Sequence, residues 1–71
     1  MNDLNHYVNK NNWPTDLEPA RLFAREAIIK WIYKEKITRF LRQVDSATSV
    51  KRIQEITIYP LLSGEGLKVI K

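Results

Sequence analysis

Hydrophobic positions in the first two thirds of the chain follow the period of a helix. From about residue 16 to residue 44, apolar side chains recur at intervals of three and four residues, which is the spacing of one helical face. Ala20, Ala24 and Ala27 are strong helix formers, and no glycine, proline or asparagine lies between residues 20 and 44. The pattern predicts one long, uninterrupted helix over about 16–44.

The C-terminal third changes to the alternation of a β-strand. Residues 56–59, Ile-Thr-Ile-Tyr, combine β-branched and aromatic side chains, and residues 63–66 have the composition of a turn. These features predict a β-hairpin over about 56–70. In the alternative interpretation, residues 50–59 are helical and Pro60 ends that helix.

The N-terminal segment, residues 1–14, is expected to be a short helix followed by a loop, and to be mobile. Its asparagines are poor helix formers, and Pro14 disfavours a helical conformation at Trp13. Together, these patterns predict a single small α+β domain over residues 1–71, with one long central helix, short flanking helices and a C-terminal β-hairpin.

Two lines of side chains run along the predicted long helix at 100° per residue. The first line is apolar throughout and is predicted to form the core beneath the hairpin: Leu22, Ile29, Tyr33, Ile37, Phe40 and Val44. The second line has two isoleucines at its centre and basic residues at both ends: Arg21, Arg25, Ile28, Ile32, Lys36 and Arg39. An apolar centre with a charged rim is typical of a protein interface. The second line, with Trp31 between the two, therefore forms the candidate partner-binding site.

Ile28 and Ile32 raise the question of what covers them in so small a protein. Burying such a side chain is worth about 1.5–3 kcal/mol, and a hairpin on the first line cannot also reach the second. One answer is a second copy of the chain, crossing at these two residues in a two-fold homodimer. The other is the N-terminal helix, folded back so that Leu4, Tyr7 and Val8 cover them.

Positive charge is concentrated in the same part of the chain. The formal net charge of the protein is +4. Residues 19–44 alone contain seven basic and two acidic side chains, so this segment carries +5. Such a field attracts an acidic protein surface, nucleic acid or anionic lipid. Because isoleucines are poor contacts for phosphate, the pattern favours an acidic or amphipathic protein partner, with nucleic acid as the alternative.

Residues with catalytic or metal-binding chemistry are few. The chain has no cysteine, and His6 is its single histidine, so neither a zinc site nor a Cys–His pair can be assembled. We therefore predict no catalytic site, no metal and no cofactor. We also predict no transmembrane segment and a cytoplasmic location, because the sequence has no apolar run of about 20 residues and no signal-peptide pattern.

The resulting hypothesis is a small, non-catalytic regulatory or adaptor protein. It self-associates and binds a macromolecular partner, preferentially a protein, through the basic and apolar face of its long helix. The alternative is a small basic regulator that binds nucleic acid through the same arginines and lysines. Binding to phosphates weakens steeply with salt, whereas an apolar interface responds much less, and this difference separates the two hypotheses.

Overall fold

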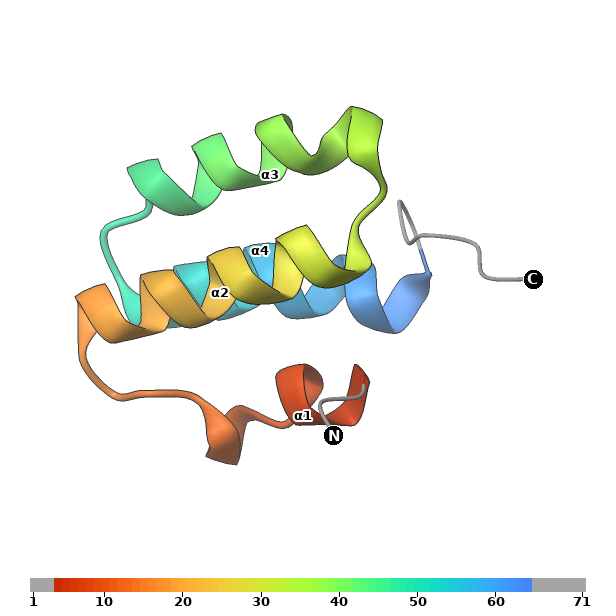
Figure 1. The fold of residues 1–71 in the computed structure, drawn as a ribbon. Coiled ribbons are helices and arrows are strands. Elements are labelled where there is room, and N and C mark those ends of the chain that lie inside the picture. Colours follow the sequence, from red (N-terminus) through yellow and green to blue (C-terminus); the bar gives the residue numbers. More distant parts are fainter. Residues whose placement is uncertain (1–3, 65–71) are drawn as a thin grey trace.

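The computed structural model describes residues 4–64, and helices account for most of them (Figure 1). In chain order these elements are α1 (Leu4–Val8), the short 3-10 helix η1 (Lys10–Asn12), α2 (Leu17–Trp31), α3 (Lys34–Ser46) and α4 (Val50–Ser63). No β-strand occurs within residues 4–64. The described part of the protein is therefore all-α, and the predicted α+β class is wrong.

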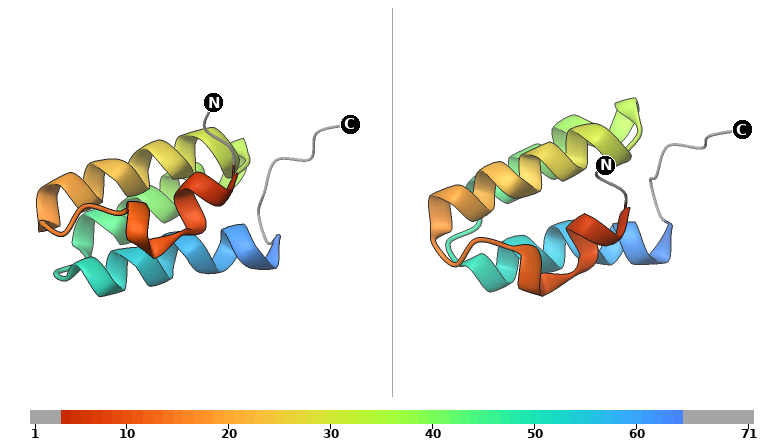
Figure 2. Two further views of the ribbon diagram at one scale, coloured as in Figure 1. Left: turned by 90° about the horizontal axis from the view of Figure 1, so that it is seen from below. Right: turned by 60° about the horizontal axis from the view of Figure 1, so that its bottom comes forward.

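The three long helices pack against one another, and α1 covers one of the grooves between them. Helix α2 contacts both α3 and α4, and α3 and α4 also contact each other. Helix α1 touches α2 and α4, on the opposite side of the bundle from α3 (Figures 1 and 2). Helix α1 thus closes the groove between α2 and α4, whereas the side of the bundle formed by α2 and α3 and the outer side of α4 remain at the surface.

Helix α4 occupies the part of the predicted hairpin that lies within the described residues. Residues 56–59 lie inside this helix, and Ile56, Thr57 and Ile58 are buried there. Burial against the other helices outweighs the preference of these β-branched residues for a strand. The second predicted strand, over residues 67–70, lies outside the described residues.

The alternative interpretation, a helix ended by Pro60, places that end one turn too early. Pro60 lies inside α4; its ring fixes φ near the helical value, but it removes one N–H donor and crowds the carbonyl four residues earlier. The helix ends at Ser63, and Gly64 follows in the left-handed region with φ 78°. The Gly64 N–H donates to the Pro60 carbonyl over 3.0 Å, which is a common way to close a helix C-terminus.

The predicted single helix over 16–44 is wrong in one respect, because it is broken after Trp31. Ile32 and Tyr33 adopt extended conformations, with ψ 139° and 157°. The Ile32 N–H donates to the Ile28 carbonyl at the end of α2, and Tyr33 precedes the first turn of α3. No local breaker residue marks this point. The break allows α3 to fold back against α2, and their mutual burial provides the free energy that a continuous helix would not gain.

Small side chains determine which side of α2 faces the core. Ala20, Ala24, Ala27 and Ile28 are its buried residues. Alanines on the inner side allow neighbouring helices to approach closely, since interhelical distance depends on the side chains at the contact. The first apolar line is therefore only partly a core. Val44 is buried, and Ile37 and Phe40 are half-buried and pack against the core, but three members are exposed: Leu22, Ile29 and Tyr33.

The N-terminal segment contributes large side chains to the core. Tyr7 of α1 is fully buried and Trp13 is 5% exposed. The Trp13 indole Nε1 donates to the Tyr7 carbonyl over 2.7 Å. Phe23 of α2 lies against the rings of both residues and of His6, with centroids 4.7–5.4 Å apart. Aromatic packing thus anchors α1 and η1 to α2.

Two neighbouring isoleucines test this packing, because Ile28 is 1% exposed and Ile29 is 52% exposed. We expect Ile28→Ala to lower the free energy of unfolding by about 2–5 kcal/mol, since it leaves a cavity in the core. Ile29→Ala, the matched control, should change it by about 0.5 kcal/mol or less. Urea denaturation followed by circular dichroism measures both. Equal losses, or a larger loss for Ile29→Ala, would contradict the orientation of α2.

Candidate interaction surface

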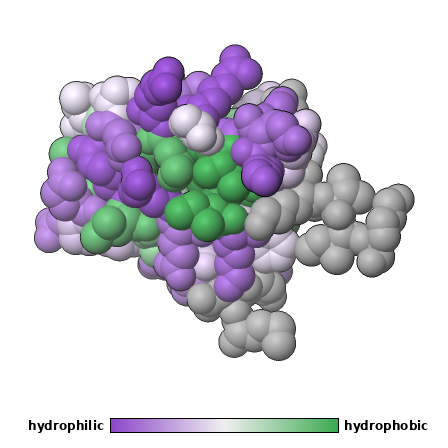
Figure 3. Space-filling model, turned by 45° about the horizontal axis from the view of Figure 1, so that its top comes forward, coloured by the Kyte–Doolittle hydropathy of each residue, from purple (hydrophilic) through white to green (hydrophobic). Residues whose placement is uncertain are grey.

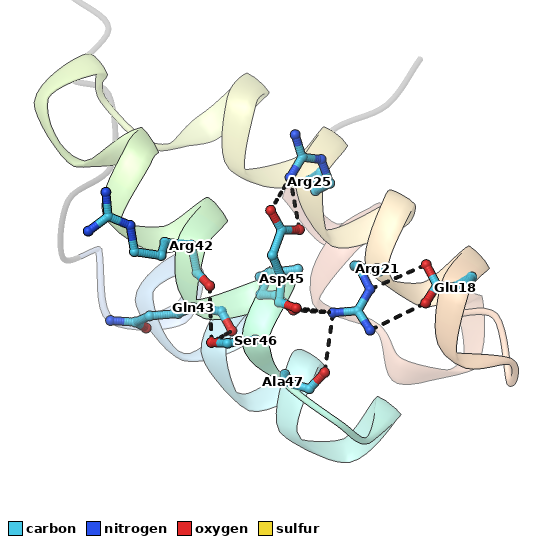
Figure 4. Close-up of polar contacts among 9 residues, drawn as sticks. Glu18, Arg21, Arg25, Arg42, Gln43, Asp45, Ser46 and Ala47 are labelled. Carbon is cyan, nitrogen blue, oxygen red and sulfur yellow. Dashed lines mark hydrogen bonds and ion pairs between the residues drawn. The ribbon is translucent and has the colours of Figure 1, made fainter.

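Arg21, the first of the predicted basic contact residues, binds the end of a neighbouring helix. Its Nη1 donates to the carbonyls of Val44, Asp45 and Ala47 over 2.7, 2.8 and 3.2 Å. These carbonyls lie at the C-terminus of α3, where backbone acceptors lack helical partners and the dipole favours a cation. Glu18 approaches the other side of the guanidinium at 3.4 Å (Figure 4). Arg21 therefore serves as a cap for α3, supplied by α2.

Arg25 also makes its contact within the chain. Its Nη1 donates to both carboxylate oxygens of Asp45 over 2.9 and 2.8 Å, across the gap between α2 and α3 (Figure 4). The two side chains are 37% and 51% exposed, so the pair contributes only about 0–1 kcal/mol to stability. The pair has a larger effect on the surface charge of α3, because Arg25 neutralises the carboxylate of Asp45, which then does not offset the other cations of this helix.

Ile28 and Ile32 do not reach the surface. They are 1% and 0% exposed and belong to the same hydrophobic cluster as Tyr7. The chain's own helices cover them, so a partner or second copy cannot contact them while the protein is folded. Trp31 is half-buried, and its indole Nε1 has no hydrogen-bond partner among the described residues.

The remaining predicted residues, Lys36 and Arg39, lie on α3 with two further cations, Lys34 and Arg42. Lys36 is half-buried and the other three are exposed. No ion pair involves any of the four within residues 4–64. Lys34 and Lys36 also lie in the first turn of α3, where the helix dipole disfavours positive charge. Helix α3 contains these four cations and two carboxylates, Glu35 and Asp45, so an excess of positive charge remains on it.

A surface not predicted from the sequence lies along α2 and the turn into α3. Leu22, Ile29 and Tyr33 are 67%, 52% and 40% exposed. Leu22 and Ile29, seven residues apart, share one side of α2, and Tyr33 lies in the turn that follows this helix. The Arg25–Asp45 pair sets the register of α2 against α3. Leu41 of α3 is partly buried and packs against the core cluster.

We use the name α2–α3 face for Leu22, Ile29 and Tyr33 together with the half-buried Ile37 and Leu41. Figure 3 shows hydrophobic residues gathered between α2 and α3, with hydrophilic residues on either side. A signal for this surface exists in the sequence: Ala20, Ala24 and Ala27 mark the inner side of α2, which turns the larger residues outward.

The described residues contain little else that indicates chemistry. Within residues 4–64, no group of three or more His, Asp or Glu side chains is placed to hold a metal ion. None of the helices in this part of the chain is long and apolar enough to cross a membrane. The α2–α3 face is consequently the leading candidate for a functional surface.

Arg21 can be tested as a structural residue against a matched arginine on the same predicted line. We expect Arg21→Ala to lower the free energy of unfolding by about 1.5–3 kcal/mol, because charge-assisted bonds to three carbonyls are lost. Arg39→Ala, at an exposed position on α3, should cost about 0.5 kcal/mol or less. Thermal and urea unfolding of both variants measure the difference. Similar small effects would show that the cap contributes nothing to stability.

Comparison with protein-family models, with curated proteins and with solved structures finds no match to this chain. No relative therefore supplies a function or a set of site residues. The functional conclusion depends on the chemistry of the surfaces described above.

Proposed function

We propose that this chain is a non-catalytic regulatory or adaptor module that binds an acidic, amphipathic segment of a partner protein on the α2–α3 face. The observation that carries the proposal is the line of Leu22, Ile29 and Tyr33, three large apolar side chains exposed next to unpaired cations. Such a line is costly for a small protein to leave in water, and a partner that covers it recovers that free energy.

The apolar part of the face supplies the contact area. Full burial of each such side chain is worth about 1.5–3 kcal/mol, and Leu22 and Ile29 both retain more than half of their surface in water. Leu22 and Ile29 lie along α2, so an amphipathic helix laid beside α2 can contact both of them with the apolar residues of one of its faces. Interfaces of this kind have an apolar centre and a polar rim.

The charged residues of the α2–α3 face determine which sign of charge a partner should carry. Lys30 and Lys34 flank Ile29 and Tyr33 in sequence, Arg42 lies on the exposed side of α3, and all three are exposed. Within the described residues they form no ion pair. Acidic residues at the rim of a partner complement these charges, accelerate association and discriminate against basic partners.

Nucleic acid remains the second candidate because of one specific feature, the cations on α3. Lys36, Arg39 and Arg42 are available to phosphates in the described structure, whereas Arg21 and Arg25 are engaged within the chain. The exposed apolar line beside them is a poor phosphate contact. It favours the protein partner over the nucleic acid.

A pair of synthetic helical peptides of roughly 18 residues, or five turns, tests the proposal. Both carry leucine on one face; the opposite face carries glutamate in one peptide and lysine in the other. In titration calorimetry we expect the glutamate peptide to bind and the lysine peptide not to bind. Ile29→Asp should weaken binding at least about tenfold, or 1.4 kcal/mol, because it places a carboxylate in the apolar centre.

Leu62→Asp provides the matched control, since it adds the same charge at a side chain that is 69% exposed on α4, and binding should be unchanged. Equal binding of the two peptides, or no effect of Ile29→Asp, would contradict the proposal. Retention of DNA that weakens steeply with salt, without binding of the glutamate peptide, would favour the nucleic-acid alternative.

A further inference from the structure

The turn between α2 and α3 is short and contains no residue that favours a break. Ile32 and Tyr33 are extended, with ψ 139° and 157°, and the residues on either side of them, Trp31 and Lys34, are helical. Residues 28–40 include no glycine, proline or asparagine. The local sequence therefore permits a helix to continue through this turn, and only the packing of α3 against α2 within one chain prevents it.

The start of α3 is weakly stabilised for a helix N-terminus. Tyr33 occupies the cap position and makes no side-chain hydrogen bond to the first turn, where serine, threonine, aspartate or asparagine would provide one. The first turn contains Lys34 and Lys36 against the single carboxylate of Glu35, at the end of the helix where the dipole disfavours positive charge. Both disadvantages disappear if α2 and α3 form one helix, because residues 34–36 then lie in its interior.

The contacts that hold the two halves of the chain together can be made equally well between two copies. Helix α2 contacts α3 and α4, and α1 contacts α4. The polar contacts of Arg21 with the end of α3 and of Arg25 with Asp45 join the same two halves. A second copy has an identical α3 and α4, so it can supply every one of these contacts.

The register of α2 against α3 is symmetric about the turn. Arg21 Nη1 lies 2.7 Å from the Val44 carbonyl, and these two residues are equally far in sequence from the turn at residues 32 and 33. Two uninterrupted helices, laid antiparallel with a two-fold axis at this turn, therefore place α2 of each copy against α3 of the other in nearly the same register. Such a contact is self-complementary, as a two-fold arrangement requires.

We propose that two copies of this chain exchange α3 and α4, giving a two-fold dimer in which residues 17–46 form one helix in each copy. Each bundle then consists of α1 and α2 of one copy with α3 and α4 of the other. The burial that the monomer obtains by breaking the helix is obtained between copies with the helix intact, and helical backbone bonds across residues 32 and 33 are added in both chains. Because the folded bundle must open first, the dimer forms during folding at high concentration and not by collision of folded monomers.

The exchange changes the origin of the α2–α3 face. In the dimer, Leu22 and Ile29 of one copy lie beside Ile37 and Leu41 of the other, and two such faces form in one particle. A partner with two acidic segments would then bind with a gain set by effective concentration. The exchange itself does not rest on the proposed function, since it is measured without any partner.

Refolding of the full chain from urea at about 1 mM tests the proposal, because a chain's own helices compete at an effective concentration of millimolar order. Salt at about 0.5 M screens the exposed lysines Lys30 and Lys34, which approach the axis from both copies. In sedimentation velocity we expect a dimer after refolding at about 1 mM and a monomer after refolding at about 10 μM.

Two substitutions of Tyr33 form a matched pair, since both remove the same half-exposed ring. Tyr33→Asn gives α3 a cap and disfavours a continuous helix, so dimerisation should require at least about tenfold higher concentration. Tyr33→Ala removes any cap and favours a continuous helix, so dimerisation should require a lower concentration than in the wild type. Equal dimer fractions in the two variants would contradict an exchange controlled by this turn.

A distance within one chain distinguishes the exchange from a contact between closed monomers. The chain has no cysteine, so spin labels can be attached at Leu22→Cys and Gln43→Cys, both at exposed positions. In the monomer these labels lie on adjacent helices, whose axes are about 10 Å apart. In the exchanged dimer they lie on one helix, roughly 30 Å apart at 1.5 Å per residue.

An excess of unlabelled chain during refolding leaves only the distance within a copy to be measured by pulsed electron paramagnetic resonance. A dimer that keeps the short distance would overturn the proposal. Monomers of both the wild type and Tyr33→Ala after refolding at about 1 mM would also overturn it. Failure of peptide binding to the α2–α3 face leaves these measurements unaffected, so the two proposals fail separately.

Discussion

The contact of Arg21 with the end of α3 is the interaction on which the arrangement of the bundle depends. Helix α3 has no basic residue in its last turn. Ser46 and Ala47 donate locally to the Gln43 and Val44 carbonyls, whereas the carbonyls of Asp45 and Ala47 accept from a donor on another helix. Arg21 supplies it from α2, 23 to 26 residues away in sequence. Together with the Arg25–Asp45 pair, this contact fixes α3 alongside α2 after the chain reverses at Ile32 and Tyr33.

The same contacts shape the electrostatics of the surface. Glu18 and Asp45 are used within the chain by Arg21 and Arg25, so they do not neutralise the other cations of α2 and α3. Lys34, Arg39 and Arg42 of α3 thus remain exposed and form no ion pair within residues 4–64.

The choice of alanine for the inner side of α2 links the core to the surface. Ala20, Ala24 and Ala27 are fully buried, which leaves room for α4 but contributes little apolar area per residue. Larger apolar residues of α2 are then displaced outward, and Leu22 and Ile29 become surface residues. The alanines on the inner side of α2 therefore account both for its close packing and for the exposure of its larger apolar residues.

The sequence by itself determined the local features of this protein. The helical period over about residues 16–44, the concentration of positive charge and the scarcity of catalytic residue types follow from composition and spacing. Among the predicted contact residues, Lys36 and Arg39 do lie at or near the surface. These properties can be predicted from the sequence because each depends only on residue type or on residues nearby in the chain.

Only the tertiary structure decided the break at Ile32 and Tyr33, the helical state of residues 56–59 and the burial of Ile28 in place of Ile29. Each is a choice between local conformations of similar free energy, made by burial against helices distant in sequence. The role of Arg21 belongs to the same class. A side chain that appears in the sequence as a surface cation becomes a helix cap only when α3 has folded back to meet it.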